Sequence, residues 1–424
     1  MRHSLVIGGP MAALLLAFGT AACASQPVSR ASSSAAPASV DSGVASASAA
    51  TSPALTSAVL GAARLASLAL ASPQRGDGLF VSQRGTDCTA LSGATTDGGA
   101  RFRSAAVITR WNCNHSAPVA WIAADSAGDA FAYGPSLFIA SSAAGPWHKS
   151  PQAGTVLSVS AVGRSVWMLL ARCRGAASTP NGCVLHLVES GNGGRTWKPV
   201  KSQPSGAVTR GNESGPSYEP AAGQTWLLRA GRSAAYVLAS PAVSDRGKSD
   251  SARLWYTANG GASWSRRRLG CGIGALSVSM ARSPGGALVG VCADEPGAGF
   301  QVKTTLISSN GGRTWTRRAG CGFRPGCRDP LYSGYLGQVA ALSARTAFLV
   351  GDRSSLLVTT DGGRHWHPVR PVVGDTSGGT FQVTFLSRSS GVVLGQGGAT
   401  NEDVDVFRTS DGGRTWSRVV PRLS

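Results

Sequence analysis

Alternating apolar and polar positions recur along this chain and predict many short β-strands. The stretch TAFLVGDRSSLLVTTDGGRHWHPV, residues 346–369, is typical: two apolar runs flank a short polar break, and the second run ends in a glycine-containing turn. Long runs of Leu, Glu and Lys at helical spacing do not occur, whereas the chain holds 56 glycines. The pattern therefore predicts an all-β fold whose strands are joined by tight turns.

An octapeptide that follows these apolar runs returns about every fifty residues. Two altered copies begin at Thr95, where Phe102 replaces the final tryptophan, and at Ser141, where the acid and one further residue are missing. The successive copies, altered ones included, are separated by 46, 49, 67, 51, 51 and 50 positions, and an insertion near 201–223 accounts for the long interval. This period predicts one four-stranded blade per copy, hence a seven-bladed β-propeller over residues 61–424. The full copies begin at Ser190, Thr257, Ser308, Thr359 and Thr409.

The residue types within the octapeptide predict a turn. An Asp or Asn at the third position can accept hydrogen bonds from the following backbone N–H groups, and the two glycines after it permit positive φ. The final tryptophan begins the next strand and can bury its ring against the hairpin. The acceptors are Asp97, Asn192, Asn259, Asn310, Asp361 and Asp411, and the tryptophans are Trp197, Trp264, Trp315, Trp366 and Trp416.

The octapeptide resembles the Asp-box, or BNR repeat, of sialidases, sortilin-type receptors and propellers like the photosystem II assembly factor. The resemblance extends from about residue 62 to the C-terminus. It implies that each box lies in the hairpin between the third and fourth strands of a blade and is structural rather than catalytic. The function is then expected elsewhere.

The opposite face, which carries the connections between blades and those between second and third strands, is the predicted ligand face. The longest segments of the chain fall in these connections, where long loops often carry function. As ligand-face candidates we take Trp111, Arg210, Tyr218, Glu219, Asp294, Glu295, Arg324, Arg328, Asp329, Tyr332, Tyr335, Glu402 and Asp403.

Sialidase activity is the alternative function. The resemblance implies that such an enzyme would need three arginines on the substrate carboxylate, a Tyr–Glu nucleophile and an Asp acid/base. Tyr332 or Tyr335 could pair with Glu219, but only Arg64 lies in the first blade, without the Arg-Ile-Pro-type motif of that family. The sequence therefore favours a binding or assembly module without catalytic residues over a secreted glycoside hydrolase.

The N-terminus predicts export. Residues 1–22 combine Arg2, an apolar stretch and small residues before Cys23, which resembles a bacterial lipoprotein signal with Cys23 as the lipidated residue. The apolar stretch is too short to span a membrane as a helix. An ordinary cleaved signal peptide is the alternative. Residues 23–60, rich in Ala, Ser and Pro, predict a disordered tether, so we expect an extracytoplasmic protein, lipid-anchored or secreted.

Eight cysteines remain beside Cys23, an even number that indicates an oxidising compartment. Pairing of near neighbours would keep each disulfide within or beside one repeat, whereas metal binding has no C-x-x-C motif to support it. The pairs predicted are Cys88–Cys113, Cys173–Cys183, Cys271–Cys292 and Cys321–Cys327.

Lys and Arg exceed Asp and Glu by 19. The arginines 266–268, 317–318, 364 and 414 lie in or just after the octapeptides and should line the outer strands, where a cationic rim could meet an anionic membrane surface or envelope polymer. His365 and His367 lack an evident third metal ligand. We therefore expect an envelope protein or glycan as partner, a monomer, and no nucleic acid, metal or cofactor.

Overall fold

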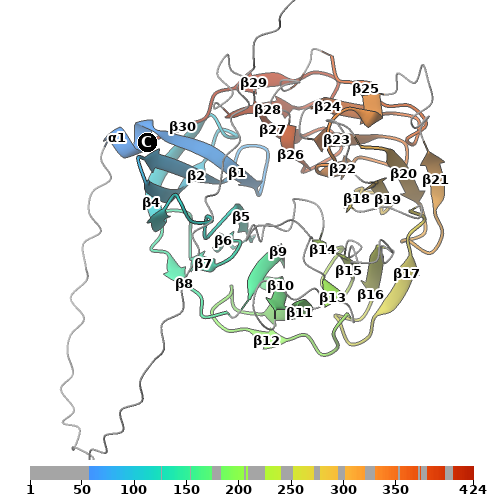
Figure 1. The fold of residues 1–424 in the computed structure, drawn as a ribbon, viewed down its shortest axis with the longest axis horizontal. Helices are drawn as coiled ribbons and strands as arrows, with labels where there is room; N and C mark the ends of the chain where they lie inside the picture. Colours follow the sequence, from blue (N-terminus) through green and yellow to red (C-terminus); the bar gives the residue numbers. More distant parts are fainter. Residues whose placement is uncertain are drawn as a thin grey trace, which may run out of the picture. The chain divides into compact units, whose positions relative to one another are not determined.

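The computed structural model describes residues 57–424 except 126, 153, 174–182, 205–206, 209–224, 240–251, 272–276, 295–300, 320–329, 352–353, 371–372, 374–379 and 397–403. Seven antiparallel sheets follow one another in chain order around a ring, as Figure 1 shows. The predicted seven-bladed β-propeller is confirmed. None of the helices in the described ranges is long and apolar enough to cross a membrane.

Each blade takes its strands in chain order, with the first strand innermost (Figure 1). Blade 1 holds β1 (Ala63–Leu70), β2 (Gly76–Arg84), β3 (Asp87–Thr95) and β4 (Arg101–Asn112). Blade 2 holds β5 (Trp121–Ala124), β6 (Ala130–Tyr133), β7 (Leu137–Ala140) and β8 (His148–Lys149). Blade 3 holds β9 (Thr155–Val162), β10 (Ser165–Cys173), β11 (Cys183–Ser190) and β12 (Lys198–Pro199), with β13 (Ala207–Val208) paired to β11.

Blades 4 to 7 repeat the same order without the additional strand. Blade 4 holds β14 (Thr225–Arg229), β15 (Ala235–Ala239), β16 (Arg253–Thr257) and β17 (Ser265–Arg268). Blade 5 holds β18 (Ser277–Arg282), β19 (Leu288–Ala293), β20 (Lys303–Ser308) and β21 (Thr316–Ala319), and η1 (Pro330–Tyr332) follows it. Blade 6 holds β22 (Val339–Ala341), β23 (Ala347–Gly351), β24 (Ser354–Thr359) and β25 (His367–Pro368), and blade 7 holds β26 (Thr380–Phe385), β27 (Gly391–Gln396), β28 (Val404–Thr409) and β29 (Ser417–Val419).

The core is divided among the contacts between neighbouring blades. Among the described residues, seven hydrophobic clusters occur, and each joins residues of two adjacent blades. In β19, for example, Leu288 and Cys292 face blade 4, whereas Val289 and Val291 face blade 6. Alternate side chains of a strand point to opposite faces, so the middle strands are buried on both sides and read as continuous apolar runs.

Side chains of one blade also satisfy the innermost strand of the next. The innermost strand of a blade is an edge strand, so the N–H groups on its free edge have no partner within the sheet. Ser279 of β18 accepts the Val339 N–H at 3.0 Å, and Gln338 accepts the Val383 N–H at 3.0 Å. Gln382 of β26 holds Leu68 of β1 through both of its backbone groups, at 3.1 and 2.6 Å. The last contact joins blade 7 to blade 1 and helps close the ring.

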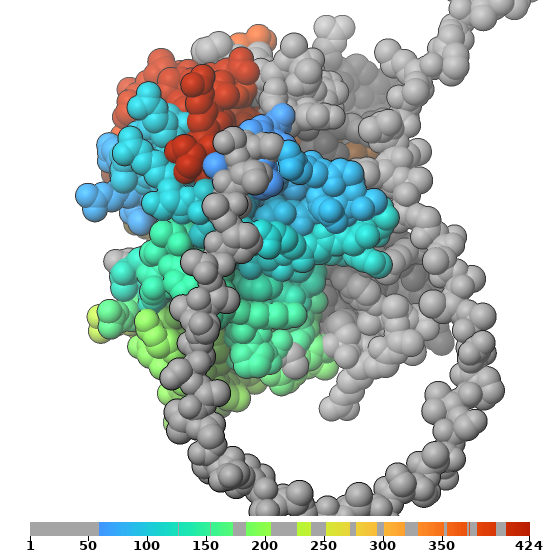
Figure 2. All heavy atoms as spheres, turned by 90° about the vertical axis from the view of Figure 1, so that its left-hand side faces the viewer, coloured from blue at the N-terminus to red at the C-terminus, as the bar shows by residue number. Residues whose placement is uncertain are grey.

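The C-terminus closes the ring on the outside of blade 1. The strand β30 (Arg422–Leu423) pairs in parallel with β4. Figure 2 shows the C-terminal residues, in red, lying against blade 1. The amide of Arg422 donates to Ala100 O at 3.0 Å and that of Ser424 to Phe102 O at 2.9 Å. The ring is thus closed by a fifth strand rather than by completion of a four-stranded blade.

The octapeptides lie between the third and fourth strands, and three of their tryptophans donate hydrogen bonds to the preceding blade or to the segment that follows it. Trp264 of blade 4 donates its indole N–H to Ser202 O in the segment after blade 3, at 2.9 Å. Trp366 of blade 6 donates to Thr305 of blade 5 at 3.0 Å, and the shortened copy in blade 2 uses Trp147 on Ser92 of blade 1 at 2.8 Å. In the first copy the replacing Phe102 is buried against Phe80, with ring centroids 4.9 Å apart.

The turn hydrogen bonds follow the sequence expectation. Asp361 Oδ1 accepts the amides of Arg364 and His365 at 3.0 and 3.1 Å, and the Thr359 hydroxyl donates to it at 2.9 Å. These donors, together with the His365 ring 2.7 Å from Oδ2, lower the pKa of Asp361 despite the opposing desolvation. Hydrogen bonds to the ionised carboxylate also lower the pKa values of Asp97 and Asp411. The octapeptides are structural turns, with His365 engaged by its own turn.

Two of the four predicted disulfides lie within the described ranges. Cys88–Cys113 links the start of β3 to the residue after β4, and Cys271–Cys292 links the connection after blade 4 to β19 of blade 5. Strand pairing places the backbones of Cys173 and Cys183 opposite each other. The side chains of that pair, and Cys321 and Cys327, lie outside the described residues.

The N-terminal boundary differs slightly from the expectation. The predicted tether runs to residue 60, but α1 (Ser57–Gly61) is helical, and Val59 and Leu60 pack against the cluster between blades 7 and 1. These two apolar side chains are partly buried there, which places α1 in contact with the propeller. The predicted signal peptide, Cys23 and the rest of the tether lie outside the described residues.

Candidate functional site

The two faces of the propeller differ in the length of their connections. On one face, which we call the turn face, lie the octapeptides and the short turns between first and second strands. On the other, the loop face, lie the connections between blades and between second and third strands. Antiparallel pairing fixes this assignment, because the first and third strands of a blade run in the same direction. The strands that flank the predicted long segments therefore all end on the loop face.

The described ligand-face candidates gather in only one place, the junction between blades 5 and 6. Asp294 follows β19, Tyr332 ends η1, and Tyr335 precedes β22. Gln301 connects them: its amide N–H donates to Asp294 O at 3.1 Å, and its oxygen accepts the Leu336 N–H at 2.7 Å. We call these residues, with Lys303, the junction site.

Lys303 anchors the connection that carries the two tyrosines. Its side chain is only 1% exposed, and its ammonium group donates to the carbonyl oxygens of Leu331, Ser333 and Gly334 at 3.0, 3.1 and 2.8 Å. Three carbonyl dipoles directed at one cation compensate part of the cost of its burial. The bend after η1 is therefore held against β20, and the adjacent tyrosines are presented on a fixed backbone.

Close backbone packing fixes the other end of this connection. Gly337 donates to Val350 O at 3.1 Å, and a Cβ on Gly337 would stand 2.6 Å from that oxygen. A Cβ on Gly351 would stand 2.3 Å from Tyr335 O. Only glycine allows the connection to lie this close to the end of β23.

Asp294 and the tyrosines give the junction site its chemistry. The side chains of Asp294, Tyr332 and Tyr335 are half-buried. Burial raises the pKa of Asp294, and Arg317 on β21 opposes the shift without cancelling it. The junction site thus combines a carboxyl group that is more easily protonated than usual with two half-buried tyrosines, of which Tyr332 has a buried hydroxyl.

The remaining candidates are not brought to this site by the described structure. Trp111 lies at the end of β4 in blade 1 and packs, partly buried, against the cluster between blades 1 and 2. The other candidates lie outside the described residues: Arg210, Tyr218, Glu219, Glu295, Arg324, Arg328, Asp329, Glu402 and Asp403.

Sequence reasoning missed Gln301 and Lys303, the two residues that organise the junction site. A lysine at the start of the apolar strand KTTLIS is the one signal that could have indicated Lys303. The arginines are placed as expected, because Arg266–Arg268 lie on the outer strand β17 and Arg317–Arg318 on the outer strand β21. Across the described ranges, no three His, Cys, Asp or Glu side chains are grouped so that they could hold a metal ion.

Comparison with known proteins shows the fold alone. No family model and no curated protein matches the chain. A structure described as YCF48 bound to D1 peptide is 16% identical, covers 82% of this chain and 93% of its own, and has a TM-score of 0.50. A GH74 xyloglucanase from Xanthomonas campestris is 11% identical over 85% of this chain and 60% of its own, with a TM-score of 0.46. A PL25 ulvan lyase is 10% identical over 83% and 91%, with a TM-score of 0.48.

Proposed function

We propose that this chain is a non-catalytic binding or assembly propeller that acts outside the cytoplasm, with its partner on the loop face. The observation that carries the proposal is the junction site, where Lys303 and Gln301 hold Tyr332 and Tyr335 on a fixed connection of that face. Rigid presentation of aromatic side chains reduces the ordering entropy lost on binding and is typical of recognition surfaces.

An envelope protein is the partner that we favour over a glycan. Tyrosines are enriched at the centres of protein interfaces, where the ring is buried and the hydroxyl hydrogen-bonds. The YCF48 structure of similar fold is described as bound to a peptide, which supports a protein partner for such a propeller. The two disulfides support an oxidising, extracytoplasmic compartment.

Site-specific photo-crosslinking in living cells tests the partner face. A photoreactive residue at Tyr335 should give a discrete adduct with an envelope protein, whereas the same residue at Arg364, exposed on the turn face, should not. An adduct of equal yield from both positions, or from Arg364 alone, would contradict the proposal.

Membrane attachment through Cys23 is part of the same proposal. Cys23→Ala should release the protein from the membrane fraction or leave it unprocessed. Mass spectrometry that finds cleavage at another bond and an unmodified Cys23 would remove the lipid anchor and leave a secreted protein.

A glycoside hydrolase of the sialidase type is the second candidate, favoured by one observation. Asp294 has a raised pKa, as a general acid requires, and shares a junction with two tyrosines. Release of the fluorophore from a sialoside by the purified protein, abolished by Tyr332→Phe or Tyr335→Phe at unchanged melting temperature, would establish this function instead.

A further inference from the structure

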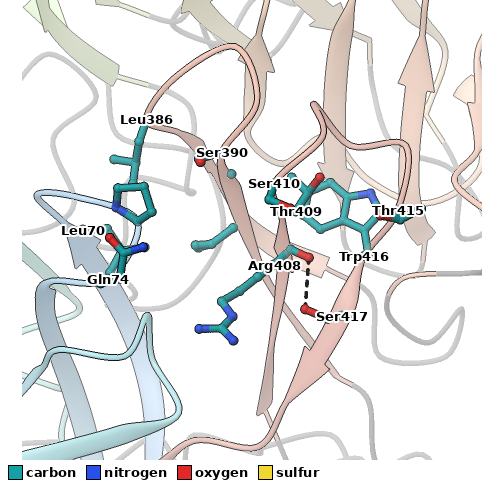
Figure 3. Close-up of a pocket in the computed structure, with 13 residues that line it drawn as sticks. Leu70, Gln74, Leu386, Ser390, Arg408, Thr409, Ser410, Thr415, Trp416 and Ser417 are labelled. Carbon is teal, nitrogen blue, oxygen red and sulfur yellow. Dashed lines mark hydrogen bonds between the residues drawn. The ribbon is translucent and has the colours of Figure 1, made fainter.

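A second site lies on the turn face, at the seam where blade 7 meets blade 1. A cleft of about 490 Å³ opens there, as Figure 3 shows. The strands β27 and β28 and the last octapeptide line one side, and the turn between β1 and β2 lines the other. Its volume falls within the range of about 300–1,000 Å³ that is usual for small-molecule sites. We call it the seam cleft.

Arg408 gives the seam cleft its charge. In Figure 3 its side chain extends from β28 toward the strands of blade 1. One guanidinium nitrogen donates to the backbone oxygen of Asp97 across the seam, which fixes the position of the group. Among the described residues Arg408 has no ion pair, so its charge is left for a ligand. A planar guanidinium with donors to spare matches a carboxylate.

Hydroxyl and amide groups also line the seam cleft. The side chains of Gln74, Ser390 and Ser410 line the cleft and make no hydrogen bond to any other described residue. Thr415 donates its hydroxyl to Asp411 at 2.6 Å and keeps its acceptor lone pairs. The cleft thus offers several groups that can both donate and accept, which is what the hydroxyls of a sugar require.

An apolar wall completes the seam cleft. The indole of Trp416 is fixed by its N–H bond to Gly413 O at 3.0 Å and by edge contacts with Phe348 and Phe385. Leu70 and Val392 also line the cleft. A fixed aromatic ring beside polar groups suits the C–H face of a pyranose.

The backbone of the walls argues against an extended peptide. Gly391 pairs with Thr409 and Val392 with Arg408 in the β27–β28 ladder, and Leu70 pairs with Gly76 in blade 1. These strands have no open edge in the cleft to which a peptide could add. Recognition must therefore rely on side chains, of which one is a cation and several are neutral hydrogen-bonding groups.

We propose that the seam cleft binds an acidic sugar, with the carboxylate of a hexuronate unit on Arg408 and its hydroxyls on Gln74, Ser390 and Ser410. A single guanidinium suits the single charge of a carboxylate. This site is separate from the partner face proposed above, because it lies on the opposite side of the blades.

Isothermal titration calorimetry on the purified protein tests the proposal with galacturonate and its oligomers as probes. Galactose and the methyl ester of galacturonate serve as neutral controls, and an acetylated, amidated aspartyl peptide as the peptide control. We expect galacturonate to bind and the neutral sugars to bind at least about tenfold more weakly, since a hydrogen-bonded charge pair contributes that much.

Variants locate the binding. Arg408→Gln should weaken binding of galacturonate about tenfold or more, and Ser410→Ala severalfold, whereas Arg414→Gln should leave it unchanged. Arg414 is exposed on the same octapeptide but does not line the cleft. Should Arg408→Gln fail to fold, Ser410→Ala and Gln74→Ala carry the test, because neither side chain bonds to other described residues.

Three results would overturn the proposal. These are no binding of galacturonate at millimolar concentration, equal binding of galactose, or binding of the peptide but not of the sugar. Equal losses in Arg408→Gln and Arg414→Gln would overturn it too, since they would indicate charge attraction without a site. Tyr335→Phe on the loop face should not change sugar binding, so failure of this proposal and failure of the partner proposal are distinguishable.

Discussion

The second glycine of the octapeptide should matter more for stability than the first, and blade 6 offers a matched pair to measure the difference. Gly362 and Gly363 have φ values of 77° and 76°, so an alanine at either position meets the same backbone strain, about 1–2 kcal/mol. Their surroundings differ. A Cβ on Gly362 would lie 3.3 Å from Ala344 O, whereas one on Gly363 would lie 2.4 Å from the Thr305 methyl group in blade 5.

The additional cost at Gly363 follows from this contact. Thr305 is fully buried and accepts the Trp366 indole N–H at 3.0 Å, so it cannot move away without breaking the bond between blades. Overpacking of a core typically costs about 1–3 kcal/mol. We therefore expect Gly362→Ala to lower the free energy of unfolding by about 1–2 kcal/mol, and Gly363→Ala by about 2–5 kcal/mol.

A double-mutant cycle with Thr305→Ser identifies the cause. Serine removes the methyl group but keeps the hydroxyl that Trp366 needs, so alone it should cost about 1 kcal/mol. In the Gly363→Ala background it should restore about 1 kcal/mol, whereas beside Gly362→Ala the two costs should add. Equilibrium urea unfolding followed by tryptophan fluorescence gives each value. Equal costs for the two alanines, or no coupling with Thr305, would refute the close-approach argument.

Four further predictions concern Lys303, the pH dependence due to Asp361, the pH dependence due to Asp77, and the disulfides. Lys303→Met leaves three carbonyl groups without their donor and should lower the free energy of unfolding by about 3 kcal/mol or more. Amide hydrogen exchange in residues 331–336 should become faster. Unchanged exchange there would contradict the anchoring function of Lys303. The folded-state pKa of Asp361 is lowered from 3.8, so the ionised carboxylate stabilises the fold above pH 4, and this stabilisation is lost as the pH falls below 4. The melting temperature of Asp361→Asn should therefore depend less on pH between pH 5 and 2.5 than that of the unmodified protein. Burial raises the pKa of Asp77 to about 6, so stability should fall as pH rises from 4 to 6, and Asp77→Asn should raise the melting temperature at pH 7 but not at pH 3.5. Non-reducing peptide maps should contain Cys88–Cys113 and Cys271–Cys292, whose loops of 25 and 21 residues correspond to about 3–3.5 kcal/mol each by chain entropy; free thiols would contradict both pairs.

The repeat made most of the fold predictable, because the octapeptide marks the same hairpin in every blade. Its internal hydrogen bonds follow from local chemistry, as for Asp361 with the amides of Arg364 and His365. Its contacts with the preceding blade do not, since nothing in the eight letters indicates that Gly363 will meet Thr305, more than fifty residues earlier. Sequence periodicity thus predicts the blades but not how they are fastened together.

The candidate sites were less predictable for the same reason. Asp294, Tyr332 and Tyr335 could be selected as polar or aromatic residues of long connections, but their grouping depends on Gln301 and Lys303, whose partners are backbone atoms without a sequence signature. The seam cleft is harder still, because it joins the turn after β1 to β27 and β28, more than three hundred residues apart in the chain.

Ring closure sets the seam apart from the other contacts between blades. Every other pair of neighbouring blades is consecutive in the chain, whereas blades 7 and 1 are joined only by noncovalent contacts and by the strand β30 on the outside of β4. Gln382 joins the innermost strands of blades 7 and 1, and Arg408 joins the two blades at the turn face. A hydrophobic cluster fills the space between the two blades. Arg408 therefore serves both in closure of the ring and in the proposed site. A ligand that binds across the seam should then stabilise the ring against opening, and the melting temperature should rise with its concentration.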